Sequence, residues 1–237
     1  MPSKNQKSKL AVTAPHLPQK PAVTELPDGH RGRVGHGYGD QSQGVLADHG
    51  IYSEIVLAHA QLAGQAARDV TFEEARFERV RLNGSRLSAL HVRDARFDTC
   101  DLAEADWSKA QLTRVEIVES RLLGFKAGEA RIQDTVFRDC NGALALFWSA
   151  TFKRVRFERC DLHEASFHDA DLSGVVFDRC DLRDAAMQGA KLAGADFRGS
   201  QIDGLKVGAD DLRGAIIDPA QAVAFVQLLG LVVRWEE

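Results

Sequence analysis

The sequence lacks the patterns by which many enzymes and membrane proteins are recognised. It has no GxGxxG, P-loop or HExxH pattern, and none of its four cysteines is paired as CxxC. No stretch is apolar enough to span a membrane, and the start has no secretory hydrophobic region. The formal net charge is only −4. These absences disfavour a nucleotide-binding enzyme, a zinc protein and a membrane protein, and they predict a cytoplasmic chain that needs no cofactor.

Proline is almost absent after the start of the chain. Five of the six prolines lie within residues 1–27, and glycine and histidine cluster in residues 28–40. This part has no apolar periodicity, so residues 1–50 are expected to form a flexible lead-in. Lys4, Lys7 and Lys9 are too sparse for an arm that binds nucleic acid.

What the chain has instead is a period of five residues. From Leu57 to Ile217 every fifth position is a central position, which holds a large apolar residue with few exceptions, and a small or thin residue precedes it by two. Neither the 3.6-residue period of a helix nor the two-residue period of a flat strand fits this pattern. A chain that places one bulky and one small residue inward in every five must turn a corner about once per unit.

Like residues recur at every fourth unit, which indicates that four units make one coil. Four units per coil predict a four-sided tube of about eight coils, with roughly 4.8 Å between layers. We name two of the sides by their central residues. The Phe side contains Phe77, Phe97, Ile117, Phe137, Phe157, Phe177 and Phe197, and the Leu side contains Leu62, Leu82, Leu102, Leu122, Gly142, Leu162 and Leu182.

Units such as Ala170-Asp171-Leu172-Ser173-Gly174 resemble the A(D/N)LXX motif of the pentapeptide repeat family. The resemblance covers about two thirds of the chain. It implies an all-β fold, a right-handed quadrilateral β-helix, over residues 51–217. Within that family, the quinolone-resistance proteins are thought to mimic DNA, to bind type II topoisomerases and to dimerise through the carboxyl end.

A helix is predicted to follow the last coil. Asp218 and Pro219 are suited to the N-cap and the first helical position, residues 220–229 carry the helix, and Gly230 can end it. Residues 218–237 should therefore cap the β-helix, and their apolarity favours a homodimer through this end, with a capped monomer as the alternative. The candidate cap and dimer residues are Phe225, Leu228, Leu229, Leu231 and Trp235.

Two surface features are candidate sites for another protein. The first is the acidic outer surface of the Leu side, which could resemble the phosphate track of DNA, although aspartate before the central leucine also serves to hydrogen-bond the corner. The second is an apolar patch in residues 141–149, where we expect a bulge or corner and where Trp148 could instead fold over Gly128. The acidic candidates are Asp101, Glu104, Asp161, Glu164, Asp181, Asp184 and Asp203, and the patch candidates are Leu144, Leu146 and Trp148.

No group of residues favours catalysis or metal binding. His163, His168, Ser166 and Asp169 all fall at outward positions of a convex rod, with no pocket to exclude water. His30, His36, Asp40 and His49 have irregular spacing for a metal site. The cysteines share one inward column and are expected to be reduced fillers of the core. They are Cys100, Cys140, Cys160 and Cys180.

We therefore predict a non-catalytic β-helix that binds another protein. The most specific candidate partner is DNA gyrase or topoisomerase IV, bound through the acidic side, and the alternative is a scaffold or regulator that binds through the apolar patch. Direct binding of nucleic acid is disfavoured, because acidic residues offset the arginines of the first coils.

Overall fold

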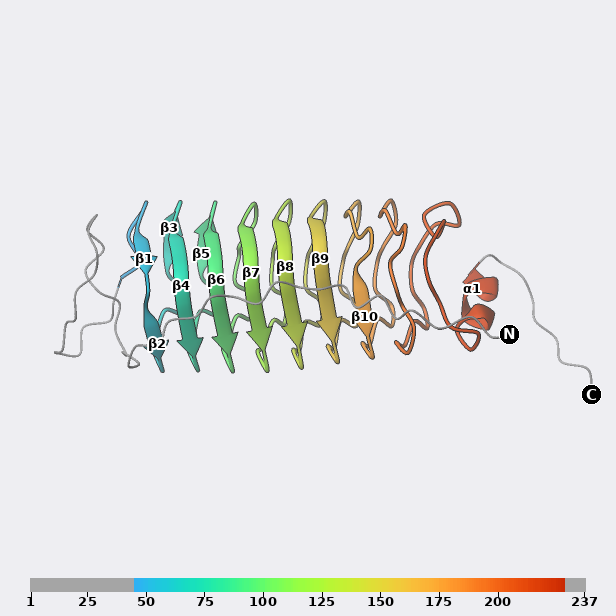
Figure 1. Ribbon diagram of the computed structural model, residues 1–237, viewed down its shortest axis with the longest axis horizontal. Helices are drawn as coiled ribbons and strands as arrows, with labels where there is room; N and C mark the ends of the chain where they lie inside the picture. The colour runs from blue at the N-terminus through green and yellow to red at the C-terminus, as the bar shows by residue number, and fades with distance from the viewer. Residues whose placement is uncertain (1–44, 229–237) are drawn as a thin grey trace, which may run out of the picture.

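Parallel strands stacked in a single direction form the body of the molecule. The structure is a computed structural model that describes residues 45–228, and it shows a rod of coils with one helix at the carboxyl end (Figure 1). The elements are β1 (Ile51–Ser53), β2 (Val56–Ala58), β3 (Ala66–Arg68), β4 (Thr71–Glu78), β5 (Arg86–Ser88), β6 (His91–Asp98), β7 (Gln111–Val118), β8 (Arg131–Arg138), β9 (Thr151–Glu158), β10 (Val176–Asp178) and α1 (Ala222–Leu228).

Each strand residue pairs with the residue four units further along the chain. In β4, β6 and β7 the partners are Phe77 with Phe97 and Phe97 with Ile117, all parallel. One ladder continues in this register along the rod without a break. It joins Val56, Arg76, Arg96, Glu116, Val136, Arg156, Val176, Asp196 and Ile216. The prediction of a β-helix with four units per coil is confirmed.

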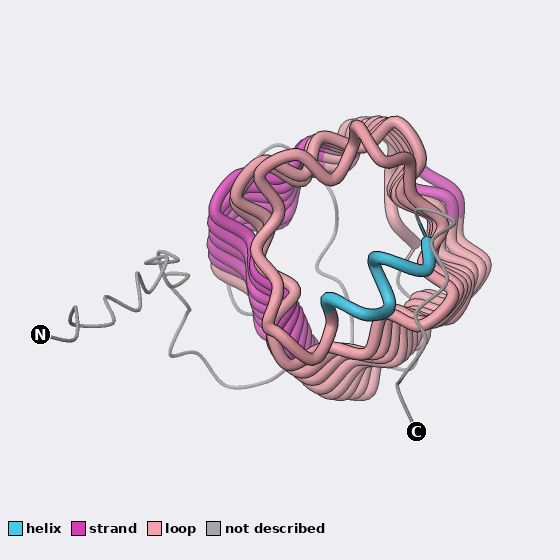
Figure 2. The backbone as a smooth tube through the Cα atoms, turned by 90° about the vertical axis from the view of Figure 1, so that its right-hand side faces the viewer, coloured by secondary structure: helices cyan, strands magenta, loops and turns pink. Residues whose placement is uncertain are grey.

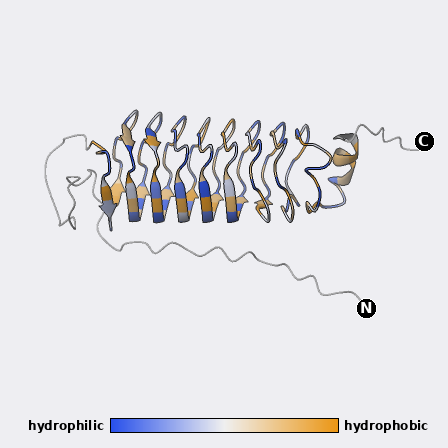
Figure 3. Ribbon diagram, turned by 90° about the horizontal axis from the view of Figure 1, so that it is seen from above, coloured by the Kyte–Doolittle hydropathy of each residue, from blue (hydrophilic) through white to orange (hydrophobic). Residues whose placement is uncertain are grey.

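The central residues fill the interior of the tube. Phe77 and Phe97 are fully buried, and their rings stack with centroids 4.3 Å apart and planes within 3°. Phe157 and Phe177 stack in the same way at 5.3 Å. Burying each such side chain is worth about 1.5–3 kcal/mol before the loss of conformational entropy is subtracted. Hydrophilic and hydrophobic residues alternate along the strands, and the alternation repeats from coil to coil (Figure 3).

Corners are made by residues in the left-handed region of backbone conformation. The residue two positions after a central residue has a positive φ in nearly every unit, for example 53° at Arg154, 54° at Glu164 and 73° at Gly174. In many units a hydrogen bond closes the turn, as from the amide of Ala165 to the carbonyl of Leu162 at 3.0 Å. Positive φ at the third of four residues is the mark of a type II turn.

The first coil begins earlier than the periodicity indicates. The five-residue pattern starts at Leu57, but β1 before it already pairs with β4, and Tyr52 is fully buried and stacks on Phe72. Leu46 is also buried, and its amide donates to the side-chain oxygen of Gln65 at 2.7 Å. The remainder of the predicted lead-in, residues 1–44, lies outside the described part of the chain.

Of the bulge or corner expected at residues 141–149, the bulge is absent, and the chain makes the same corners there as in the other units. Asn141 pairs with Asp161 and Leu146 pairs with Ser166 in the same register as the other coils. The reason is that the next coil fills the space left by Gly142. A Cβ atom on Gly142 would lie only 3.1 Å from a methyl carbon of Leu162, so the interior remains packed without any shift of the backbone.

The helix α1 lies across the open end of the last coil (Figure 2). Asp218 and Gln221 exchange hydrogen bonds at its start, each from a backbone amide to the side-chain oxygen of the other at 3.0 Å, which is a capping box. The Gln221 side chain also donates to the backbone carbonyls of Phe197 and Ser200. Phe225 is buried and contacts Phe197 edge-on, with ring centroids 6.5 Å apart. These contacts attach the helix to the last coils and cover their exposed backbone.

The described part of α1 agrees with its predicted position, but the dimer is not tested. Leu229, Leu231 and Trp235 lie outside the described residues, and of Leu228 only the backbone is described. The homodimer through this end therefore stays a prediction. No helix in residues 45–228 is long and apolar enough to cross a bilayer.

Two buried serines give a test of the packing. Within the described part of the chain, the buried hydroxyl of Ser85 has no hydrogen-bond partner. The hydroxyl of Ser120 accepts from the Cys100 amide at 3.0 Å and donates to the Val118 carbonyl at 2.8 Å. Because an unsatisfied buried hydroxyl is unfavourable, we expect Ser85→Ala to raise the free energy of unfolding by about 1 kcal/mol and Ser120→Ala to lower it by about 1–3 kcal/mol.

Thermal and urea unfolding of the two variants and the wild type measure this difference. Equal destabilisation by both substitutions would show that the Ser85 hydroxyl has a partner in solution.

Candidate interaction surface

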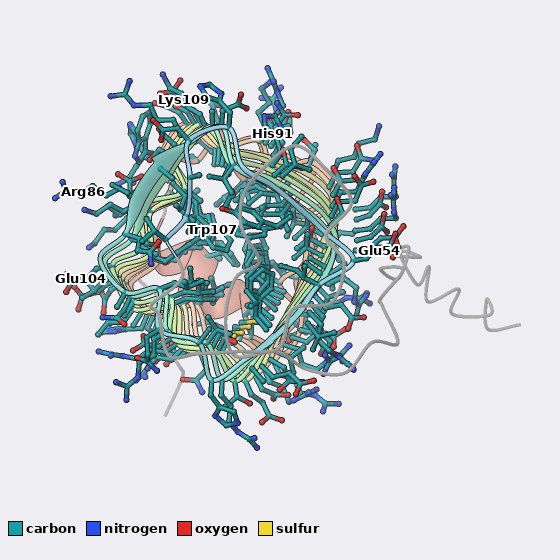
Figure 4. All side chains as sticks on the ribbon, turned by 90° about the vertical axis from the view of Figure 1, so that its left-hand side faces the viewer. Glu54, Arg86, His91, Glu104, Trp107 and Lys109 are labelled. Atoms are coloured by element: carbon teal, nitrogen blue, oxygen red, sulfur yellow. The ribbon has the colours of Figure 1, made fainter. Side chains whose placement is uncertain are left out.

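Charged side chains surround the rod, and its interior is closed. Glu54, Arg86, Glu104 and Lys109 point outward on different sides, whereas Trp107 points into the packed interior (Figure 4). Trp107 is fully buried against Phe97 and Phe125. Any partner must therefore bind on the outer surface.

The histidines do not form a catalytic group. The Nε2 atom of His163 lies 3.1 Å from a carboxylate oxygen of Glu164, and that of His168 lies 3.3 Å from one of Asp169. Each ring thus has a neighbouring carboxylate as its partner on an exposed surface, and Ser166 lies between them in sequence. This geometry does not provide a base held against a nucleophile.

The described residues also contain no metal cluster. No group of three or more His, Cys, Asp or Glu residues within 45–228 is placed to hold an ion. His49 pairs with Asp69 at 2.9 Å, and the residues considered with it, His30, His36 and Asp40, lie outside the described part of the chain.

The cysteine column is a structural feature of the core. All four thiols are buried and free, and each donates to the carbonyl of a central residue on the Phe side, as Cys160 does to Phe137 at 3.4 Å. Burial raises the pKa of the Cys100 thiol to about 12, so the thiolate form is negligible at neutral pH. Their burial confirms the prediction that the cysteines fill the core, and their reduced state stays a prediction.

Some aspartates of the acidic side hydrogen-bond the backbone at the corners of the coils. One carboxylate oxygen of Asp101, Asp161 and Asp181 accepts a hydrogen bond from the backbone amide two residues later, at 3.1 Å in each case. The structural role that the sequence left open for these aspartates is therefore present. Arg183 also hydrogen-bonds Asp181 and holds the pKa of that carboxyl below its usual value.

The acidic residues gather toward the carboxyl half of the Leu side. A shallow open depression of about 160 Å³ lies among Asp161, Asp181, Asp184, His163 and Arg183. Glu164 and Asp203 are exposed at outward positions of the same side. Earlier on this side Arg121 lies 3.7 Å from Asp101, so the amino half is closer to neutral.

The neighbouring charges on other sides are mostly paired. Arg114 binds Asp94 through two hydrogen bonds of 2.6 and 2.5 Å, and Arg154 binds Asp134 in the same way at 2.5 and 2.6 Å. Both carboxylates are nearly buried. These pairs were not predicted from the sequence, although opposite charges 20 residues apart, both in the left-handed position, indicate them.

One coil presents an uncharged band across two sides. Residues 141–149 contain no charged side chain, and Leu144 and Trp148 are 48% and 41% exposed. Trp148 covers Gly128, because a Cβ atom there would lie 2.2 Å from the indole ring. Leu144 has a φ of 60°, a conformation that is unfavourable for leucine. We call residues 141–149 the apolar band.

Family models match most of the rod. A model described as "Pentapeptide repeat region" matches residues 55–127 and 122–187, and one described as "Pentapeptide repeats (8 copies)" matches residues 180–206. The chain belongs to the pentapeptide repeat family. No curated protein matches it.

Solved structures with a similar fold are distant in sequence. Two forms of QnrB1, described as a plasmid-mediated fluoroquinolone resistance protein, are 19% and 18% identical. They cover 80% and 81% of this chain and 98% and 100% of their own, with TM-scores of 0.40 and 0.41. HetL from the cyanobacterium Nostoc sp. strain PCC 7120 is 22% identical, covers 72% of this chain and 90% of its own, and has a TM-score of 0.23. Likenesses at this level carry no inference about function.

The apolar band makes a prediction about stability. Asparagine tolerates a positive φ whereas leucine does not, so Leu144→Asn should raise the free energy of unfolding by about 1 kcal/mol. Leu144→Ser is the matched control, since serine is polar but gains little in this conformation. An equal gain from both substitutions, measured by urea unfolding, would contradict a conformational origin.

Proposed function

We propose that this chain is a non-catalytic protein-interaction rod whose acidic surface imitates DNA toward a basic site on another protein. The most specific candidate partner is a type II topoisomerase, DNA gyrase or topoisomerase IV, since the acidic side could resemble the phosphate track of the DNA that these enzymes bind. The chemistry requires only a rigid row of carboxylates, which stacked coils provide without a cofactor.

The observation that supports the proposal is the charge density of the carboxyl half of the Leu side. Three coils there carry five carboxylates against the single guanidinium of Arg183. With roughly 4.8 Å per layer, this gives one net negative charge per roughly 4 Å of rod. One strand of DNA carries one charge per about 3.4 Å. The five are Asp161, Glu164, Asp181, Asp184 and Asp203.

The charge of two of these carboxylates can be reversed without removing a hydrogen bond that holds a corner of the backbone. Glu164 and Asp184 are exposed in the left-handed position, where many residue types occur in other coils. Asp161 and Asp181, by contrast, hold backbone amides. The variant Glu164→Lys with Asp184→Lys therefore tests the surface and spares the fold.

The experiment is gyrase supercoiling with the purified protein titrated in, with and without a fluoroquinolone. We expect wild-type protein to inhibit the enzyme or protect it from the drug at micromolar concentration or below. The double variant should need a concentration at least about tenfold higher, because electrostatic complementarity controls association.

A second double variant serves as the matched control. Glu119→Lys with Glu129→Lys changes the net charge by the same amount at exposed left-handed positions on other sides. It should behave like wild type. Absence of any effect of the wild-type protein on gyrases, including that of the source organism, would exclude this function.

The alternative is a scaffold or regulator that binds another protein through Leu144, Leu146 and Trp148. The exposure of Leu144 and Trp148 favours it, since exposed apolar side chains mark interaction sites. In that case Trp148→Ala would abolish binding and the charge reversals would not.

A further inference from the structure

The apolar band is unfavourable as a free surface. Leu144 is 48% exposed and is held at a φ of 60°, whereas the same position is glycine in the coil before and glutamate in the coil after. Trp148 exposes 41% of its surface on the adjoining side, and Leu146 between the two is half-buried. Apolar side chains gathered in this way are typical of a surface that another molecule covers.

The coils on the two sides of the apolar band carry opposite charge. Residues 121–129, in the coil before it, contain two basic residues and one acidic residue, so their net charge is +1. Residues 161–169, in the coil after it, contain three acidic residues and no basic one, so their net charge is −3 with the histidines neutral. The charged residues are Arg121, Lys126 and Glu129 before the band and Asp161, Glu164 and Asp169 after it. Along the rod the surface is therefore positive, then apolar, then negative.

This order is complementary to its own reverse. In a dimer with two-fold symmetry, the same patch serves both partners. If two rods face each other at the apolar band and run in opposite directions, the band lies against its copy. The positive coil of each rod then lies against the negative coil of the other, whereas rods that run in the same direction bring the two negative coils together. The charge pattern therefore favours a second copy of the chain as the occupant, in the antiparallel orientation.

Lys126 and Glu164 are the charges that would meet beside the apolar side chains. Lys126 is exposed and pairs in the ladder with Leu146, and Glu164 is exposed at the position that Leu144 occupies one coil earlier. Within one rod the two are two coils apart, a rise of roughly 10 Å. In the antiparallel arrangement Lys126 of each copy lies beside Glu164 of the other, so symmetry provides this contact twice.

The contact extends over only three coils. Residues 101–109 and 181–189, in the next coils outward, have net charges of −2 and −1, and they would face each other in aligned antiparallel rods. Because like charges repel, the two rods must cross at an angle and separate beyond the band. Three coils span roughly 14 Å, which gives a contact smaller than the roughly 800 Å² per partner of a stable interface. We therefore expect weak association, with a Kd between about 10 μM and 1 mM.

We propose that the apolar band is the contact surface of a weak antiparallel homodimer of crossed rods. Leu144, Leu146 and Trp148 of each copy pack against those of the other. Lys126 and Glu164 form the ion pairs beside them. This contact lies on the outer surface in the middle of the rod, so it is distinct from the predicted dimer through the carboxyl end. It requires no topoisomerase and is tested on the isolated protein.

Sedimentation equilibrium of the full-length chain, at concentrations from about 10 μM to 1 mM, provides the readout. We expect the weight-average mass of the wild type to rise with concentration toward twice its starting value. Leu144→Asn should raise the Kd at least about tenfold, because it places a polar amide in the apolar contact. The same variant is expected to be more stable to urea, so its loss of association would not come from misfolding.

An exchange of charge tests the orientation. Lys126→Glu and Glu164→Lys each place like charges together across the antiparallel contact, so each should raise the Kd at least about fivefold. Glu164→Lys changes the net charge from −4 to −2, and a general decrease in repulsion would have the opposite effect. The combined variant restores opposite charges and should return the Kd to within about twofold of wild type.

Glu119→Lys with Lys153→Glu is the matched control, since it exchanges the same charges at exposed positions on other sides of the rod. It should associate as the wild type does. A wild-type mass that does not depend on concentration would overturn the proposal, as would a combined variant that associates no better than the single ones. Association that Leu144→Asn and the single reversals leave unchanged would also overturn it, and would place the contact elsewhere on the chain.

Discussion

The hydrogen bonding of each coil to the next, at a fixed offset of four units, is the constraint on which the whole structure depends. It requires every coil to have the same length, and this in turn requires a corner at the same place in each unit. A left-handed residue two positions after each central residue makes that corner. Non-glycine residues fill most of these positions at a cost of about 1–2 kcal/mol each, so the stacking and the buried core must outweigh a strain that recurs along the entire rod.

The same constraint determines the surface. Residues one coil apart in sequence become neighbours in adjacent layers, so a carboxylate and a guanidinium at that spacing form a pair, as Asp134 and Arg154 do. Where like charges recur, they cannot separate, because the backbone holds them in place. The acidic half of the Leu side is therefore a rigid array, and its preorganisation favours binding of a complementary surface. Its carboxylates nevertheless divide into two kinds, those that hold a corner amide and those that do not.

Much of this architecture follows from the sequence, because the five-residue period and the columns that repeat with every coil report directly on the interior. The periodicity identified the central residues, and the cysteine column lies in the core where the pattern placed it. Asp218 caps the helix start as predicted, whereas its reciprocal hydrogen bonds with Gln221 were not predicted. The family is shown by its models. The bulge expected at residues 141–149 is absent, because Leu162 of the next coil fills the space left by Gly142. The five-residue period describes one unit at a time and does not report on packing between coils. For the same reason the position of Trp148 over Gly128 could only be stated as one of two alternatives. The sequence could locate the acidic side, but not which carboxylates are already used by the fold.

The uninterrupted register also bears on how such a rod can change in evolution. An in-frame duplication of one whole coil would lengthen it by about 4.8 Å and leave every later residue on its own side. A duplication of a single unit would move each later residue to the adjoining side and divide every column, the cysteine column and the acidic array included. The rod can therefore change its length in steps of one coil during evolution, and each such step leaves the residues on each side of the rod unchanged.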